Sequence, residues 1–370
     1  MKDNKENRIY VTRPFLPPLE EYVECLEEIW ENKQLTNRGL FHEKFEKALA
    51  DYLNVEYLSL VNNATTGLII AQRALGFTGE IITTPFSFVA TAHSIKWNGL
   101  TPIFVDTDSF AGNLNPEKVE EAINEKTGGI LAVHNYGIPG NVEGLQKVAD
   151  KYSLPLIYDA AAAMGVKYKN ESVLKYGQLS VMSFHATKVF TTFEGGAIIS
   201  DSVNMKQKID QMRNFSILDE EIVAGLGVNG KMNEVEASMG LLQLKSLDET
   251  IEKREAIYEE YESEIKKIDG IRMCTIPVTI EYNYAYAPIF FDNGQAMRDN
   301  LYDEMRLNNI FCRKYWYPLI THHEFYNMEQ RSELNIANNM SNQVLCLPIY
   351  PDLKHSQVHR IIEILDQYFN

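Results

Sequence analysis

At 370 residues, of which 45% are hydrophobic, the chain can bury a large core and exceeds one ordinary domain. Its formal net charge of −16 argues against nucleic acid and anionic membranes as partners. The four cysteines include no CxxC pair, so we expect reduced thiols rather than disulfides or a zinc site. No stretch approaches the roughly 20 apolar residues of a membrane span, and residues 1–8 are polar, so we expect a cytoplasmic protein.

Between residues 55 and 200, short β-branched stretches alternate with amphipathic helical ones. Such alternation predicts βαβ units, in which parallel strands form one sheet covered by helices on both faces. The expected strands are 57–61, 81–84, 102–105, 129–134 and 154–158, and the expected helices are 64–75, 90–97, 116–123 and 142–152.

The pattern becomes mainly helical beyond that point. A long helix is expected over 233–268, and its part 250–267 carries charges on most faces, which indicates a bridge between two lobes. A later strand is expected over 284–291 within a smaller α+β lobe. We therefore expect a large domain at 1–248, a small one at 249–370, and a boundary inside a helix.

The most informative segment reads SFHATK over residues 183–188 and is followed by EGGAII from residue 194. It places Lys188 between a strand end and a glycine turn. Partial burial and nearby positive charge can keep an amine neutral and able to form a Schiff base. A lysine in a loop is on its own usually a solvated surface residue, so this interpretation depends on its neighbours.

A carboxylate follows the expected strand 154–158. Asp159 begins the segment DAAAAMG, and ligands of open α/β sheets bind beyond the carboxyl ends of the strands. There it can pair with a protonated pyridine nitrogen. An aspartate before alanines is equally a good helix N-cap, and the local pattern does not separate the two interpretations.

Two earlier segments suit a flat, phosphorylated ligand. The segment NNATTG at 62–67 leads a strand into small and hydroxyl residues that open a helix, whose free N–H groups can bind phosphate. The segment PFSFVAT at 85–91 puts Phe88 after a strand, where it can stack on an aromatic ring. A plain N-cap and core packing are the respective alternatives.

The order and spacing of these segments resemble the DegT/DnrJ/EryC1/StrS sugar aminotransferases, which depend on pyridoxal 5′-phosphate (PLP). The resemblance extends from residue 14 to residue 351 and includes LTNRG at 35–39 and RKYWYP at 313–318. It implies the α/β fold of PLP-dependent transferases, like that of aspartate aminotransferase. In that fold a large, mostly parallel sheet domain is covered by helices and joined to a smaller α+β C-terminal domain.

The resemblance also implies roles residue by residue. Lys188 would carry the cofactor and move a proton, Asp159 would bind the pyridine nitrogen, and Phe88 would stack on the ring. The other implied cofactor contacts are Ala64, Thr65, Thr66, Ala162, Ser183 and, on the cofactor of a neighbouring subunit, Asn229. The implied substrate contacts are Thr36, His185, Lys231, Tyr315 and Trp316.

Position 162 departs from the family pattern. Relatives usually carry His or Gln there, in contact with the phenolic oxygen of PLP, whereas this chain has Ala162. A lost hydrogen bond costs on the order of 1 kcal/mol, and more with a charged oxygen. We therefore expect cofactor binding to survive. The change bears on the tuning of the cofactor or on turnover, unless water or a neighbouring group supplies the missing hydrogen bond.

The resemblance is strongest to transaminases that make dTDP-4-amino-4,6-dideoxyglucose, through SFHATK and RKYWYP. It implies that L-glutamate aminates a dTDP-4-keto-6-deoxyhexose for O-antigen, lipopolysaccharide or another glycoconjugate, in a homodimer with active sites at the subunit interface. Amination at C3 is an alternative that the residues do not exclude. A non-catalytic PLP-binding sensor or scaffold is another, supported only by Ala162.

Two histidines and the absent motifs complete the expectations. His185, inside the signature, is equally suited to a contact near the site or to none, whereas His134 is expected to make structural hydrogen bonds. The sequence has no HExxH, P-loop or GxSxG motif and no GxGxxG after the first strand, so we expect neither a metal site nor an NAD enzyme.

Overall fold

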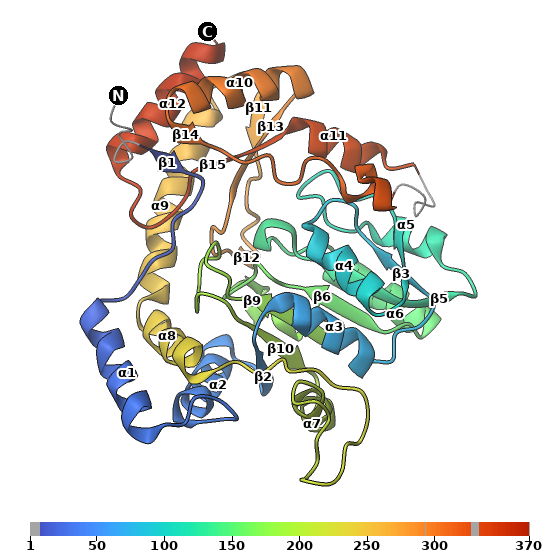
Figure 1. Ribbon diagram of the computed structural model, residues 1–370. Coiled ribbons are helices and arrows are strands. Elements are labelled where there is room, and N and C mark those ends of the chain that lie inside the picture. The colour runs from blue at the N-terminus through green and yellow to red at the C-terminus, as the bar shows by residue number, and fades with distance from the viewer. Residues whose placement is uncertain (1–7, 293, 327–332, 370) are drawn as a thin grey trace.

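The computed structural model describes residues 8–292, 294–326 and 333–369, and its centre is a seven-stranded sheet (Figure 1). The strand order is β2-β10-β9-β6-β5-β3-β4, and β10 alone runs antiparallel to its neighbours. This is the α/β architecture that the sequence predicts. The strands are β2 (Tyr57–Val61), β3 (Glu80–Thr83), β4 (Thr101–Phe104), β5 (Thr127–Val133), β6 (Leu156–Asp159), β9 (Leu179–Ser183) and β10 (Gly196–Ser200).

Side chains that alternate along these strands divide between two cores. Ile81, Leu131 and Ile157 pack on one face with residues of α3 (Ala64–Ala74), α4 (Val89–Trp97) and α7 (Val203–Met212). Their neighbours Ile82 and Ile130 pack on the other face, with residues of α2 (Leu40–Leu53), α5 (Pro116–Ala122) and α6 (Val142–Tyr152). Period-two alternation between two buried faces is what a sheet with helices on both sides requires.

The long helix expected over 233–268 is two helices. α8 (Glu234–Lys245) and α9 (Leu247–Ile265) meet at Ser246, which has non-helical backbone angles. α8 begins with a capping box, in which Asn233 accepts a hydrogen bond from the N–H of Glu236 and the Glu236 side chain accepts one from the N–H of Asn233. α1 (Leu19–Asn32) packs beside α8.

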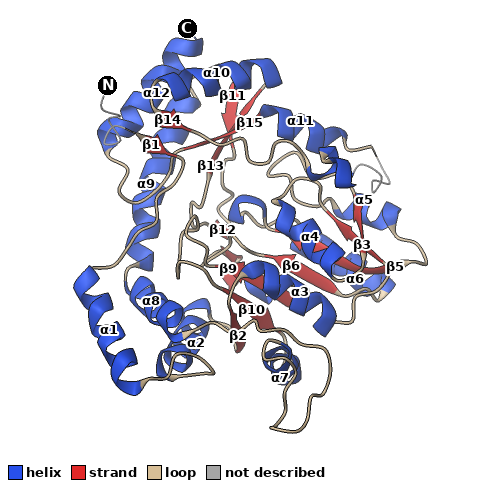
Figure 2. Ribbon diagram, in the orientation of Figure 1, coloured by secondary structure: helices blue, strands red, loops and turns tan. Residues whose placement is uncertain are grey.

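The C-terminal part forms a separate group of elements above the large sheet in Figure 2. Its antiparallel sheet contains β11 (Ile271–Met273), β13 (Ala287–Phe291) and β15 (Val344–Leu347), with helices α10 (Gln295–Leu307), α11 (Asn335–Gln343) and α12 (His355–Phe369). The expected strand 284–291 begins only at residue 287. The preceding residues 284–286 lie outside the sheet.

Two smaller sheets join distant segments. β1 (Ile9–Tyr10) pairs in parallel with β14 (Ile310–Phe311), so the first described strand lies in the C-terminal part. β12 (Ile280–Glu281) pairs with β7 (Lys167–Tyr168), which also pairs with β8 (Glu171–Ser172). Among the described residues, no helix combines the length and apolar character that a membrane crossing requires. The division at residue 248 stays a prediction.

Candidate active site

A cavity of about 320 Å³ lies where the loops after β2, β3, β6 and β9 face the C-terminal part. Strand ends from distant segments meet there because parallel strands direct their carboxyl ends to the same edge of a sheet. Most residues singled out from the sequence line it, namely Ala64, Thr65, Phe88, Asp159, Ala162, Ser183, His185, Lys188, Tyr315 and Trp316.

The carboxylate of Asp159 is buried at the base of this cavity. Thr91 donates a hydrogen bond from Oγ1 to Oδ2 at 2.7 Å, and the N–H of Ala161 donates one to Oδ1 at 3.1 Å. Burial raises the pKa of Asp159 above its usual value, while these two hydrogen bonds and the charge of Lys188 act in the opposite direction. Turns rather than a helix follow Asp159, so the helix N-cap alternative is wrong.

Lys188 is held by a loop that is anchored on both sides of it. Phe184 and Phe190 are fully buried and pack with their ring centroids 5.1 Å apart. The Lys188 side chain is half-buried, and its Nζ lies 3.4 Å from the hydroxyl oxygen of Tyr286. The expected combination of a partly desolvated amine and a buried carboxylate in one cavity is therefore present.

The first turn of α3 contributes backbone N–H groups to another wall of the cavity. Asn63 is its N-cap, and its side chain accepts the N–H of Thr66 at 2.8 Å. The first N–H groups of a helix have no partner within the helix, so those of Ala64 and Thr65 can bind an anion. N-capping and anion binding, which the sequence left as alternatives, are compatible here. Thr66 itself lines a neighbouring shallow hollow with Trp97.

Aromatic side chains form the wall toward the C-terminal part. Phe88 is 58% exposed and its ring lies 5.9 Å from that of Trp316, so the alternative of core packing is wrong. The Tyr286 ring lies 5.9 Å from that of Tyr315 and 6.4 Å from that of Trp316. Tyr136 donates a hydrogen bond from its hydroxyl to the carbonyl oxygen of Tyr315 at 2.5 Å.

Three of these residues, Tyr286, Tyr136 and Thr91, were not anticipated as site residues. Thr91 lies in α4, and Tyr136 lies in the tight turn after β5. Tyr286 belongs to a segment that reads as a continuous strand. No sequence signal marks any of the three, because their roles depend on which distant segments pack together.

The two histidines behave differently. His185 is half-exposed at the cavity, with Nδ1 2.9 Å from Thr187 Oγ1 and Nε2 3.6 Å from Glu194 Oε1. His134 is buried and its ring stacks on that of Tyr158, with centroids 4.4 Å apart. Neither of its nitrogens has a hydrogen-bond partner among the described residues, so the expectation of structural side-chain hydrogen bonds is wrong. Burial lowers the pKa of His134 to about 3.

The other expected substrate and cofactor contacts lie outside the cavity. Thr36 and Asn229 are exposed. Lys231 donates from Nζ to Asn214 Oδ1 at 2.6 Å in a separate hollow that Arg38 and Arg213 also line. Burial first, and then the charge of Arg213, lowers the pKa of Lys231.

Ala162 presents only a methyl group to the cavity, and its backbone is fixed. Its carbonyl oxygen accepts a hydrogen bond from Asn283 Nδ2 at 2.8 Å. Gly137 packs against the same carbonyl, with φ of 84°, and a Cβ at Gly137 would come within 2.5 Å of the oxygen. A side chain that donates to a ligand is therefore absent at position 162, and the segment is held in place from behind.

Comparison with known proteins gives matches along nearly the whole chain. The sequence profile of the DegT/DnrJ/EryC1/StrS aminotransferase family matches residues 19–366. A dTDP-4-amino-4,6-dideoxy-D-glucose transaminase from Shigella dysenteriae is 46% identical over 97% of this chain and 99% of that protein. One from Escherichia coli is also 46% identical, over 97% of this chain and 98% of that protein. The solved structure of DesI with its TDP-sugar product superposes with a TM-score of 0.93 at 29% identity, covering 98% of this chain and 93% of that one.

Proposed function

Because the chain belongs to the DegT/DnrJ/EryC1/StrS aminotransferase family, we propose that it is a PLP-dependent nucleotide-sugar transaminase. It transfers the amino group of L-glutamate to C4 of a dTDP-4-keto-6-deoxyhexose and yields dTDP-4-amino-4,6-dideoxyglucose. Two relatives with that activity in their names are 46% identical over almost their entire length, which favours C4 over C3. The observation that carries the proposal is that Lys188 and the buried Asp159 line the same cavity.

The residues of the cavity fit PLP. Asp159 supplies a buried negative charge for a pyridinium nitrogen, and Phe88 supplies an exposed aromatic face for the ring. The first turn of α3 supplies backbone N–H groups for the phosphate. When bound, PLP supplies an electron sink that stabilises negative charge on the substrate carbon next to the nitrogen. Asp159, kept in place by Thr91, favours the charged ring and so maintains that property.

Lys188 has two roles in this proposal. Its Nζ would hold the cofactor covalently at rest, and as a free amine it would take the proton from Cα of L-glutamate. The amino group would pass to the cofactor, and water would supply the ketone oxygen of the 2-oxoglutarate that leaves. For the sugar, the same nitrogen moves a proton in the reverse direction. The hydroxyl of Tyr286, 3.4 Å from Nζ, keeps the amine directed into the cavity.

A homodimer completes the proposed site. The loop 214–229, from Asn214 to Asn229, is closed by an isolated bridge between its two ends. It exposes a run of large apolar side chains, which monomeric proteins rarely leave in contact with water. These are Phe215, Ile217, Leu218, Ile222, Val223, Leu226 and Val228. Burying this surface against a second copy would let Asn229, which does not line its own cavity, reach the partner's cofactor phosphate.

The test is product analysis with purified protein, PLP, L-glutamate and either the 4-keto or the 3-keto dTDP-6-deoxyhexose. We expect amination of the 4-keto sugar alone. We also expect the visible absorbance band of PLP joined covalently to Lys188, which Lys188→Ala abolishes. Amination of only the 3-keto sugar would refute C4 specificity. A chain that binds PLP but never releases 2-oxoglutarate from L-glutamate would instead be the sensor or scaffold.

A further inference from the structure

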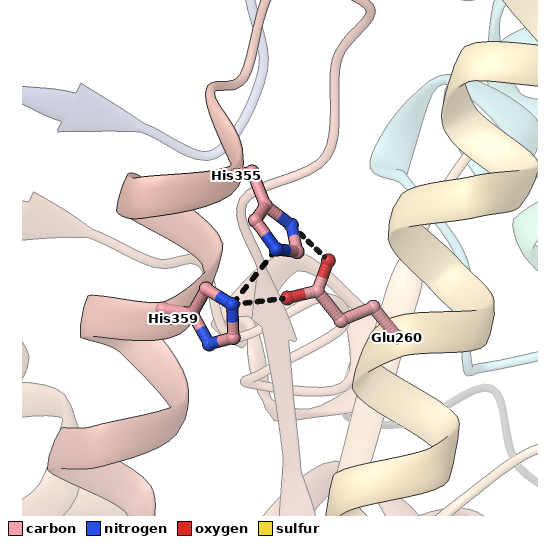
Figure 3. A group of neighbouring side chains, drawn as sticks. All are labelled: Glu260, His355 and His359. Carbon is pink, nitrogen blue, oxygen red and sulfur yellow. Dashed lines mark hydrogen bonds and ion pairs between the residues drawn. The ribbon is translucent and has the colours of Figure 1, made fainter.

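Two histidines and a glutamate meet on the surface at residues that take no part in the candidate active site (Figure 3). His355 and His359 lie one turn apart on α12, and Glu260 faces them from α9. His355 Nδ1 lies 2.8 Å from Glu260 Oε2, and His359 Nε2 lies 2.8 Å from His355 Nε2. Two imidazoles and a carboxylate from two different helices therefore lie in mutual contact.

The carboxylate is only partly satisfied by these contacts. Glu260 Oε1 is buried and accepts no hydrogen bond from the described residues, and His359 Nε2 lies 3.7 Å from it. A buried carboxylate oxygen that accepts no hydrogen bond costs free energy, which a bound cation would reduce. The side chain of Glu260 is 20% exposed, whereas those of His355 and His359 are 73% and 55% exposed. The carboxylate is thus fixed, and the imidazoles are free to adjust.

We propose that Glu260, His355 and His359 bind one divalent transition-metal ion of the Zn²⁺ type, with water as a fourth ligand. One ligand atom from each residue can be chosen so that all lie within 4.8 Å of one another. Ligand atoms around tetrahedral zinc are about 3.3 Å apart, given bonds of about 2.0–2.1 Å. Rotation of the two exposed imidazoles would bring the ligand atoms from this spacing to the shorter one that zinc requires.

The ligand types determine the class of ion. Two nitrogens and one carboxylate oxygen suit zinc and its transition-metal neighbours, whereas Mg²⁺ and Ca²⁺ prefer oxygen ligands only. The i, i+4 histidine spacing on a helix is that of hydrolytic zinc sites, but the residue after the first histidine is Ser356 instead of the glutamate that serves as their general base. The ion would accordingly fasten α12 to α9 without catalysing hydrolysis.

Calorimetric titration of the untagged, chelator-treated holoenzyme with ZnCl₂ tests the proposal. We expect one saturable equivalent that MgCl₂ does not reproduce, and a higher melting temperature with zinc. His355→Gln and His359→Gln should each weaken binding at least tenfold. Glu260→Gln should also weaken it about tenfold or more. The double variant His322→Gln, His323→Gln removes two other exposed, adjacent histidines and should bind zinc as the unchanged chain does.

The exposure of both α12 histidines means that their variants should fold, which circular dichroism checks before titration. Equal zinc titration curves for the unchanged chain and His359→Gln would overturn the proposal, as would the absence of saturable binding in the unchanged chain. Loss of zinc binding only in the His322, His323 double variant would place the ion elsewhere and likewise overturn it. Transaminase activity is not the readout, so this result is independent of the proposed function.

Discussion

At the scale of single residues, the hydroxyl group of Thr91 is the largest of three contacts that favour the charged form of buried Asp159. Burial makes a charged carboxylate costly, and the hydrogen bond from Thr91 offsets part of that cost. Ser87 Oγ lies 2.9 Å from Thr91 Oγ1, so the hydroxyl of Thr91 is itself oriented. In the proposed function, Thr91 is thus a positioning residue that would act on the cofactor through Asp159.

Thr91→Val keeps the shape of the side chain and removes the donor to Asp159. We expect PLP affinity to fall several-fold, corresponding to about 1 kcal/mol for the lost hydrogen bond. An absorbance titration of the apoenzyme with PLP measures it. Ser87→Ala, which removes a hydroxyl in contact with Thr91 Oγ1 but leaves the bond from Thr91 to Asp159, should have a smaller effect. Unchanged PLP affinity in Thr91→Val would contradict the role given to this hydroxyl.

Tyr286→Phe removes the hydroxyl next to Lys188 and leaves the ring in its aromatic surroundings. We expect PLP to remain bound and the rate of the half-reaction with L-glutamate to fall about tenfold, since the amine loses a hydrogen bond worth about 1 kcal/mol or more. Stopped-flow absorbance follows that step directly. Tyr302→Phe, a change outside the cavity, is the control, and equal rates in both variants would refute the positioning role.

His134 should make the fold sensitive to acid. Its pKa is about 3 when folded, against an ordinary value of 6.5, so the folded state resists protonation and stability is lost as pH falls below 6.5. Between pH 6.5 and pH 5 the loss is about 2 kcal/mol from this residue. His134→Phe preserves stacking on Tyr158, so its unfolding free energy should fall less over this interval. Urea unfolding at both pH values measures the difference, and parallel losses in the two proteins would contradict it.

At the scale of elements, the sequence predicted those helices and strands whose formation depends on residues close together in the chain. The βαβ alternation and the strand before Asp159 are visible because buried strands are apolar and helices start at residues such as Asn63. The break at Ser246 and the exit of Tyr286 from its strand are not visible, because packing between distant segments decides both. The same applies to the Glu260 site, whose third ligand lies 95 residues before His355.

Glu234 links two helices in a way that no local pattern reveals. Its carboxylate, at the start of α8, accepts hydrogen bonds from the N–H groups of Phe41 and His42 at 2.8 and 3.1 Å, and so caps α2. The N-cap residue of α2 is Gly39, which has no side chain to do this, and a Cβ there would lie within 2.5 Å of the Glu234 carboxylate. A buried acid on one helix thereby fixes the start of another.

Glu234→Ala should lower the free energy of unfolding by about 1–3 kcal/mol, because two buried N–H groups lose their acceptor. Thermal or urea unfolding measures it. The exposed Glu20→Ala, in the first turn of α1, is the matched control and should change stability by less than about 0.5 kcal/mol. Equal stability of the two variants would mean that water replaces the carboxylate at α2.

At the scale of the whole molecule, contacts between distant segments hold β1 and the large sheet to the C-terminal part. β1 pairs with β14, and the guanidinium of Arg13 lies 5.7 Å from the ring centroid of Tyr350. The cavity takes Asp159 and Lys188 from the large sheet and Tyr286 and Trp316 from the C-terminal part. The site is therefore a property of the assembled chain. Its sequence motifs account for Asp159, Lys188 and Trp316, but not for Tyr286.

The dimer is the prediction that concerns the molecule as a whole. In loop 214–229, Val223→Glu combined with Leu226→Glu adds two charges to an apolar surface of a chain that already carries a net charge of −16. We expect a shift from dimer to monomer by light scattering, because burying those carboxylates would be costly. PLP affinity should fall in parallel, since Asn229 would no longer reach the partner's cofactor phosphate. Val278→Glu, fully exposed but outside the loop, should stay dimeric. If the loop variant also stays dimeric and keeps its PLP affinity, loop 214–229 does not form the interface.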